Sequence, residues 1–225
     1  MITDLRDSFN PDTLHSVYAS LYAPVFTDEN ENETEEQYAQ RLQDPQGEPE
    51  THFLVYWAEQ EPVGFLIAEH YRECNCGLLT YMSVSDKARG KGVAAQLVAH
   101  AQRVLSGCRV ILAECHKPES VDADKEPIDP VLRLRILSSL GASLVPIDYV
   151  QPALRPGQQP SSALHLVSFP LQGREHQGSV DTAALLDFLT CFYRVLGAEQ
   201  DDPALSAMCQ QLCEMPAKVP LSSLL

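Results

Sequence analysis

Hydrophobic residues recur at two different spacings along the chain, and these spacings predict an alternation of helices and strands. Spacings of three and four residues predict helices over 10–22, 34–42, 93–105, 128–140, 180–196 and 203–214. Short apolar runs bounded by turn residues predict strands over 52–58, 63–71, 78–84, 109–115, 142–150 and 163–170. Strands that alternate with helices in this order indicate an α/β fold built on a mixed sheet with helices on both faces.

The regular alternation stops near position 172. A chain of 225 residues builds one substantial core and is short for two full domains. We therefore interpret residues 1–172 as one domain and residues 173–225 as a small helical C-terminal extension. The apolar face of the helix over 180–196 could cover the chain's own sheet or a second copy of the chain, so a homodimer is an open alternative.

The chain is strongly acidic, with a formal net charge of -15. Nucleic acid and anionic membranes would repel it at long range and are excluded as partners, whereas an amine-bearing partner is favoured. No run approaches the roughly 20 apolar residues of a membrane helix, and the first residues, MITDLRDSFNP, lack the basic and apolar regions of a signal peptide. We therefore expect a cytoplasmic location and no membrane partner.

The seven cysteines are an odd number, and their spacing resembles no disulfide framework. Reduced thiols are the simplest interpretation. Cys74 and Cys76 form only a C-x-C pair, and Cys209 and Cys213 lie one helical turn apart with no further ligands nearby. Because zinc sites usually have four ligands in two pairs, we expect no metal site.

A glycine-rich turn joins the strand over 78–84 to the next helix, and its residues are Arg89, Gly90, Lys91, Gly92, Val93 and Ala94. Glycines let the backbone approach a ligand closely, and the free N–H groups at the start of a helix, together with its dipole, attract anions. The two basic side chains add positive charge in a chain that is otherwise acidic. The segment therefore predicts a phosphate or pyrophosphate site.

Two familiar phosphate loops do not fit this segment. The chain contains no GxxxxGK[ST] motif, and no G-x-G-x-x-G with an acidic residue about 20 positions later. The turn resembles the R/Q-x-x-G-x-G/A signature of GNAT N-acyltransferases, with Arg89, Gly92 and Ala94 at its positions. The order of elements over roughly 1–170 is also similar to that family, which implies a mostly antiparallel sheet of about seven strands.

The resemblance further implies an acyl-CoA-dependent N-acyltransferase with acetyl-CoA as donor. In that family the turn binds the coenzyme A pyrophosphate, and the strand corresponding to 78–84 splays from the strand corresponding to 109–115 to admit the pantetheine arm. Met82, Ser83 and Val84 would then offer backbone hydrogen bonds to this arm. The acyl group would pass directly to a bound amine, which requires proximity and proton transfer but no covalent enzyme intermediate.

The catalytic residues depart from the family pattern. Many GNAT enzymes use a Glu on the strand corresponding to 78–84 as base, and as acid a Tyr four residues before the glycine that follows the helix corresponding to 128–140. This chain has no acid on that strand, and Leu137 stands four residues before Gly141. For the base we infer Glu114 as the first candidate and Glu69 as the second. For the acid the candidates are Tyr149 and Tyr81.

Other residues have weaker claims. His70 and His116 could shuttle protons but are more simply strand-end histidines, and Cys115 is interpreted as a buried hydrophobic residue. The acidic run 28–36 could select a cationic acceptor or could serve solubility alone. The acceptor is therefore an unidentified primary amine of a small molecule or a protein. Because the usual acid and base are missing, a non-catalytic acyl-CoA-binding module is the alternative function.

Overall fold

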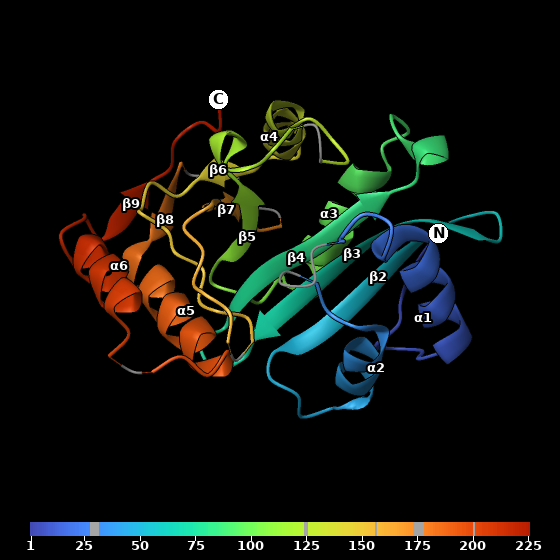
Figure 1. Ribbon diagram of the computed structural model, residues 1–225, viewed down its shortest axis with the longest axis horizontal. Helices are drawn as coiled ribbons and strands as arrows, with labels where there is room; N and C mark the ends of the chain where they lie inside the picture. Colours follow the sequence, from blue (N-terminus) through green and yellow to red (C-terminus); the bar gives the residue numbers. More distant parts are fainter. Residues whose placement is uncertain (28–31, 124–125, 156, 173–177, 200) are drawn as a thin grey trace.

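The computed structural model describes residues 1–27, 32–123, 126–155, 157–172, 178–199 and 201–225. Its centre is a seven-stranded sheet with the strand order β1-β2-β3-β4-β5-β7-β6 (Figure 1). The strands are β1 (Ile2–Asp4), β2 (Glu50–Ala58), β3 (Glu61–Tyr71), β4 (Cys76–Val84), β5 (Ile111–His116), β6 (Ser143–Leu144) and β7 (Leu164–Phe169). Neighbours are antiparallel except for the parallel pair β4 and β5, so the mixed, mostly antiparallel sheet is confirmed.

Helices cover both faces of this sheet, as predicted (Figure 1). They are α1 (Pro11–Val17), α2 (Glu35–Gln43), α3 (Val93–Val104), α4 (Pro130–Ser139), α5 (Thr182–Val195) and α6 (Pro203–Cys213). Successive strand residues point to opposite faces: Leu66 of β3 packs with α3, whereas its neighbours Phe65 and Ile67 pack with α1 and α2. On β5, Leu112 likewise faces α5 and α6. One face therefore carries α3 and α4, and the other carries α1 and α2 beside α5 and α6.

Local sequence signals explain where two of these helices begin. The Thr34 side chain accepts from the Gln37 N–H, and the Gln37 side chain accepts from the Thr34 N–H, which is the predicted capping box of α2. At α1, the Asn10 side chain accepts from the Thr13 N–H at 2.9 Å. The helix predicted over 10–22 is regular only to Val17 and continues as a π-helical turn to Tyr22.

The strand predicted over 142–150 is wrong beyond its first residues. Val145 still donates to the Leu166 carbonyl at 3.0 Å, but Pro146 has no N–H with which to extend the ladder. The N–H of Ile147 then donates to the Val145 carbonyl at 2.9 Å, and the N–H of Tyr149 to the Ile147 carbonyl at 2.8 Å. These tight turns carry Tyr149 off the strand and into the interior.

The C-terminal part shares its core with the sheet. Phe188 and Leu189 of α5 belong to the same buried cluster as Tyr71 of β3 and Leu112 of β5. The apolar face of α5 thus covers the chain's own sheet, and a homodimer stays a prediction that would need another surface. Strands β8 (Ser179–Asp181) and β9 (Lys218–Pro220), which the sequence pattern did not predict, pair in a separate two-stranded sheet. The domain boundary predicted at 172–173 borders residues outside the described part and stays a prediction.

We expect Leu189→Ala to destabilise the whole chain by about 3 kcal/mol, because it removes a fully buried side chain and leaves a cavity. Urea unfolding followed by circular dichroism measures this change. Thr190→Ala, an exposed position on the same helix, is the matched control and should change stability by less than about 0.5 kcal/mol. A loss below about 1 kcal/mol for Leu189→Ala would contradict a shared core.

Candidate functional site

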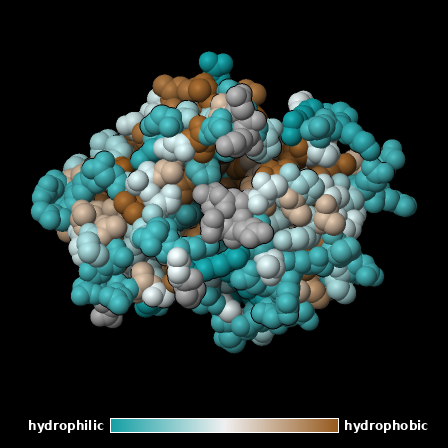
Figure 2. Space-filling model, viewed as in Figure 1, coloured by the Kyte–Doolittle hydropathy of each residue, from teal (hydrophilic) through white to brown (hydrophobic). Residues whose placement is uncertain are grey.

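A fork opens between the two parallel strands at the centre of the sheet. β4 and β5 pair at only three positions, of which the last joins Leu79 to Ala113. Next to this position the register between β3 and β4 shifts, and such a bulge bends a strand. The remaining residues, 80–84 of β4 and 114–116 of β5, diverge (Figure 1). Viewed from the face that carries α1 and α5, the surface is hollowed near its centre, over the region between β4 and β5 (Figure 2).

The backbone of β4 presents hydrogen-bonding groups to this fork. The Ser85 N–H donates to the Val63 carbonyl at 2.9 Å, which fixes the alternation in the antiparallel ladder of β3 and β4. The N–H and C=O groups of Ser83 therefore form hydrogen bonds with β3. The N–H and C=O groups of Met82 and Val84 point the other way, toward the fork. Of the three residues predicted to hold an extended arm by their backbone, the structure leaves Met82 and Val84 in position.

The glycine-rich turn follows β4 at the open end of the fork. Gly90 and Gly92 have φ angles of 73° and 76°, a left-handed conformation that glycine adopts without strain. A Cβ built on either glycine meets no atom within 4 Å, so the space above the turn is open. Gly92 caps α3, and among the described residues no side chain occupies that cap. The free N–H groups and the helix dipole at this open cap are available to an anion, and the phosphate site predicted for this turn stays a prediction.

The side chains of the turn differ in what they offer. Val93 is buried and Ala94 is part-buried, so these two residues present mainly their backbone N–H groups. Lys91 is exposed, and the exposed Arg89 pairs with Asp86 at 3.0 Å. Both cations lie in solvent, where an incoming phosphate can reach them.

One buried polar group beside the turn has no partner. The Ser85 hydroxyl, directly after β4, is buried and makes no hydrogen bond to any other described residue. Leaving a buried hydroxyl unsatisfied costs about 1–3 kcal/mol, which a bound ligand atom would remove. The orphaned hydroxyl and the open glycine turn together fit a phosphorylated ligand that enters the fork from this end.

Glu114 lies at the apex of the fork, directly after the last pair of β4 and β5. Its Oε1 accepts from the Tyr149 hydroxyl at 2.5 Å, and its Oε2 accepts from Gln151 Nε2 at 2.9 Å. Tyr149 is only 1% exposed, and burial raises its pKa well above the ordinary value, so it keeps its proton. The structure thus brings two predicted residues together, with Tyr149 acting on Glu114.

Glu69 lies on the same face but deeper. Its Oε1 accepts from Arg41 at 3.0 Å and its Oε2 from the Tyr71 hydroxyl at 2.9 Å. Burial raises the pKa of Glu69 to about 7; the charges of Glu33 and Glu114 add to this rise, and Arg41 and Tyr71 oppose it. With 5% of its surface exposed, Glu69 is a poor direct contact for a substrate.

The remaining candidates are engaged with other groups or are chemically inert. Tyr81 packs against Tyr22 and Phe26, with ring centroids 5.2 Å and 5.0 Å away. The His70 Nε2 lies 2.9 Å from the Asn75 side chain at the far end of β3. Burial raises the pKa of Cys115 to about 11, which suits a buried hydrophobic residue and not a nucleophile.

Arg41, Tyr71 and Gln151 were not found by sequence reasoning. Arg41 and Gln151 act on carboxylates that are distant in the chain, at separations of 28 and 37 residues, whereas Tyr71 bonds to Glu69 two residues before it. Arg41 is the basic residue in the last turn of α2, a place where a cation normally needs only the helix dipole. No local pattern distinguishes it from a solvated arginine.

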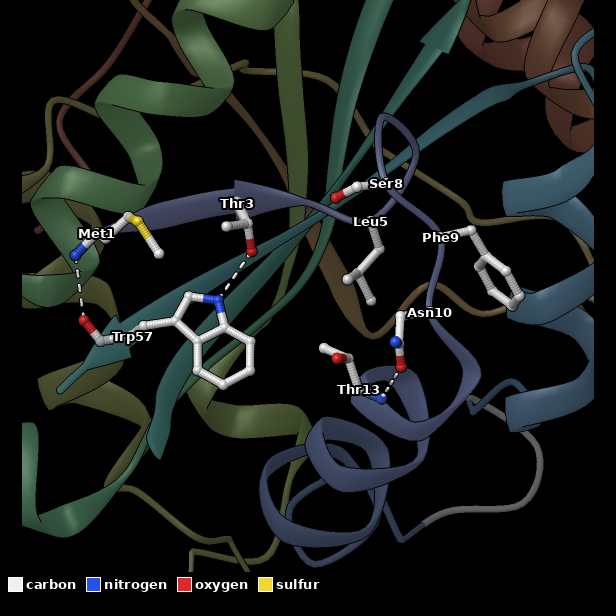
Figure 3. Close-up of a pocket in the computed structure, with 8 residues that line it drawn as sticks. All are labelled: Met1, Thr3, Leu5, Ser8, Phe9, Asn10, Thr13 and Trp57. Carbon is white, nitrogen blue, oxygen red and sulfur yellow. Dashed lines mark hydrogen bonds between the residues drawn. The ribbon is translucent and has the colours of Figure 1, made fainter. Parts of the chain in front are cut away.

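The surface of the described residues includes two shallow depressions. One, of about 450 Å³, is lined by residues from Gln151 to Ser161, and Gln151 connects it to Glu114. The other, of about 470 Å³, lies at the opposite edge of the sheet, where Trp57 donates to Thr3 at 2.8 Å (Figure 3). Only the first adjoins the fork.

The described residues contain neither a candidate metal site nor a candidate membrane-spanning helix. There, no group of three or more His, Cys, Asp and Glu side chains is placed to hold a metal ion. The seven cysteines are free thiols. No helix in the described ranges is both long enough and apolar enough to cross a membrane.

A fork between parallel central strands, with an open glycine-rich turn at its end, agrees with what the resemblance to the GNAT N-acyltransferases implies for this chain. The sequence matches the model of the acetyltransferase (GNAT) family over residues 12–124, half of the chain. The chain belongs to this family of acetyltransferases. No curated protein sequence matches it.

Solved structures with this fold are distant in sequence. A putative GNAT acetyltransferase from Bacteroides thetaiotaomicron is 18% identical and has a TM-score of 0.55, with 75% of this chain and 86% of that chain covered. An aminoglycoside 6'-N-acetyltransferase complexed with coenzyme A is 15% identical, with a TM-score of 0.53 and coverage of 78% and 99%. The PaiA N-acetyltransferase from Thermoplasma acidophilum, also with coenzyme A, is 12% identical, with a TM-score of 0.50 and coverage of 75% and 98%. At these identities the likeness establishes the fold alone.

Proposed function

We propose that the chain transfers the acetyl group of acetyl-CoA directly to a primary amine bound at the fork, with Glu114 as the general base. The position of Glu114 carries this proposal. It is a part-buried carboxylate at the apex, and two neutral donors fix both of its oxygens. The turn that holds the pyrophosphate lies at the other end of the same opening.

The dimensions of the fork support this arrangement. Residues 80–84 separate the apex from the end of β4. At about 3.3 Å per residue this is roughly 16 Å, so an extended arm anchored at the turn can bring its thioester beside Glu114. Because α3 and Glu114 lie on opposite faces of the sheet, the donor enters from one face and the amine from the other.

The proton and electron movements follow from these positions. The amine nitrogen attacks the thioester carbonyl carbon, and its proton passes to Glu114. The tetrahedral intermediate then expels the thiolate as the carbon–sulfur bond breaks. An ordinary thiol has a pKa of about 8.5, so the leaving thiolate needs little help from a strong acid. Tyr149 donates its hydroxyl hydrogen bond to Glu114. We therefore propose that Tyr149 orients the base and does not protonate the thiolate.

The acceptor is proposed to be a primary amine of a small molecule or of a protein. It reaches Glu114 beside the depression lined by residues from Gln151 to Ser161, which offers amide and hydroxyl groups for recognition. We also infer that the protein acts in a reducing compartment such as the cytoplasm, because its seven cysteines are free thiols. An amine panel assayed for release of free coenzyme A tests the proposal, and a panel without release favours the non-catalytic module instead.

Acetyl-CoA is expected to raise the melting temperature of the protein. A ligand bound only to the folded chain adds about 2.7 kcal/mol at a hundredfold excess over Kd, or about 5–11 °C for a chain of this size. Differential scanning calorimetry with and without acetyl-CoA measures this shift. Dephosphorylated pantetheine, which lacks the pyrophosphate, is the control and should produce a smaller shift. A flat melting temperature at saturating acetyl-CoA would count against the site.

A further inference from the structure

Two carboxylates, Glu69 and Glu114, lie on the acceptor face next to the fork. Glu69 of β3 is aligned with Leu78 of β4, and Leu78 is aligned with Leu112 of β5. Glu114 follows two residues after Leu112 and therefore points to the same face. Two strand spacings of about 4.8 Å and two residue rises of about 3.3 Å put the Cα atoms of the carboxylates about 12 Å apart.

Glu69 is held too firmly to handle the substrate itself. Each of its oxygens already accepts a hydrogen bond, one from Arg41 and one from Tyr71. Arg41 is fixed in turn by an ion pair with Glu33, so α2 and the segment before it clamp the guanidinium onto β3. Any effect of Glu69 on the reaction must therefore act through another residue.

We propose that Glu69 is a positioning residue for acetyl transfer: its negative charge, held by Arg41 and Tyr71, faces Glu114 and strengthens Glu114 as a proton acceptor. This inference rests on the proposed function in that it takes Glu114 as the base. Two like charges about 12 Å apart, at an effective dielectric constant of about 20, change each other's proton affinity by about tenfold. The rate of a base-catalysed step rises with the proton affinity of the base. If the proton is about half transferred in the transition state, a tenfold higher proton affinity of Glu114 speeds turnover about threefold.

The groups that face the two carboxylates come from every element packed around them. Glu69 is faced by Arg41 of α2, Glu33 of the preceding segment, Tyr71 of β3, Tyr81 of β4 and Glu114 of β5. Glu114 is faced by Glu69, Tyr71, Tyr149 and Tyr193 of α5. Burial raises the pKa values of these tyrosines, so they stay neutral, and Arg41 and Glu33 are charged groups among these described neighbours.

The coupling has a definite sign. The pKa of Glu69 is raised to about 7, and the negative charge of Glu114 contributes to this rise. Interactions between two binding sites are reciprocal, so the ionisation of Glu69 makes Glu114 hold a proton more tightly by the same factor. Turnover should therefore rise as the pH passes through 7.

The coupling can be measured without an acceptor. In the full chain labelled with 13C at the glutamate carboxyls, the Glu69 resonance is identified by its absence in Glu69→Gln. Its titration midpoint is expected near pH 7 and should fall by about one unit in Glu114→Gln. Glu73→Gln, which removes an exposed carboxylate paired with Arg194, is the matched control and should leave the midpoint unchanged. Equal midpoints in Glu114→Gln and the parent chain would overturn the proposal.

The kinetic consequence is measured with hydroxylamine as acceptor, and rates are expressed per concentration of uncharged amine, so that the titration of the acceptor adds no rise of its own. The parent chain should show a rise of about threefold in kcat/KM across neutral pH, and Glu69→Gln should lack this rise while binding coenzyme A normally. Persistence of the rise in Glu69→Gln would also overturn the proposal. If Glu114→Gln turns over at the parent rate, the proposed base fails, and the carboxyl titration still decides the coupling separately.

Discussion

Gly92→Glu is expected to abolish coenzyme A binding in a chain that still folds. The open space above Gly92 is where the pyrophosphate should lie, and a glutamate would put bulk and negative charge into it. A non-glycine residue at a φ of 76° also costs about 1–2 kcal/mol in strain. We expect Kd to rise at least about a hundredfold, or about 3 kcal/mol, in isothermal titration calorimetry.

Two further variants separate the causes of this loss. Gly92→Gln carries the same strain and nearly the same bulk without the charge, so it should weaken binding less. Gly107→Glu places the charge at another glycine with open space around it, beyond the far end of α3, and should bind coenzyme A normally. Circular dichroism confirms folding in each case. A folded Gly92→Glu chain with the parent affinity would rule out the pyrophosphate assignment.

The elements that sequence reasoning found are those whose signal is local. The capping box of Thr34 and Gln37 marks the start of α2, and the positive-φ Gly141 follows the end of α4. The glycine-rich turn was recognised because its function needs only the backbone of consecutive residues. For these features a short window of sequence holds the physical cause.

The elements that were missed or misplaced depend on distant partners. β1 has three residues and exists because it pairs with Leu54, Val55 and Tyr56 of β2. The strand beyond Leu144 fails because Pro146 cannot extend the ladder, although its apolar neighbours suit a strand. β8 precedes α5 and β9 follows α6, so the two strands that pair are separated by both helices. A local sequence pattern therefore does not predict them.

The candidate site divides in the same way. Glu114 could be inferred from its place on a strand next to the expected fork, but its partners could not. Tyr149 reaches it only because the chain turns off β6, and Glu69 is buried only because Arg41 covers it. Which side chain meets which is set by packing between elements far apart in the sequence.

Glu114→Gln is expected to lower turnover by about 10²- to 10⁴-fold, because it keeps the shape and polarity of the side chain but removes the proton acceptor. Coenzyme A binding should survive, since the pyrophosphate turn lies at the other end of the fork. Initial rates of coenzyme A release, with an acceptor from the amine panel, measure the loss. Tyr149→Phe, which leaves the carboxylate but removes one donor to it, should lose less.

The pH dependence of this loss identifies the role of Glu114. As the pH rises, more of the amine is already neutral, so a base has less to contribute and the deficit of Glu114→Gln should shrink. A residue that only positions the substrate would give a deficit that is constant with pH. Comparing kcat/KM of the variant and the parent from pH 6 to pH 9 separates the two roles, and parent-like turnover at neutral pH would leave an ordered water as the proton acceptor.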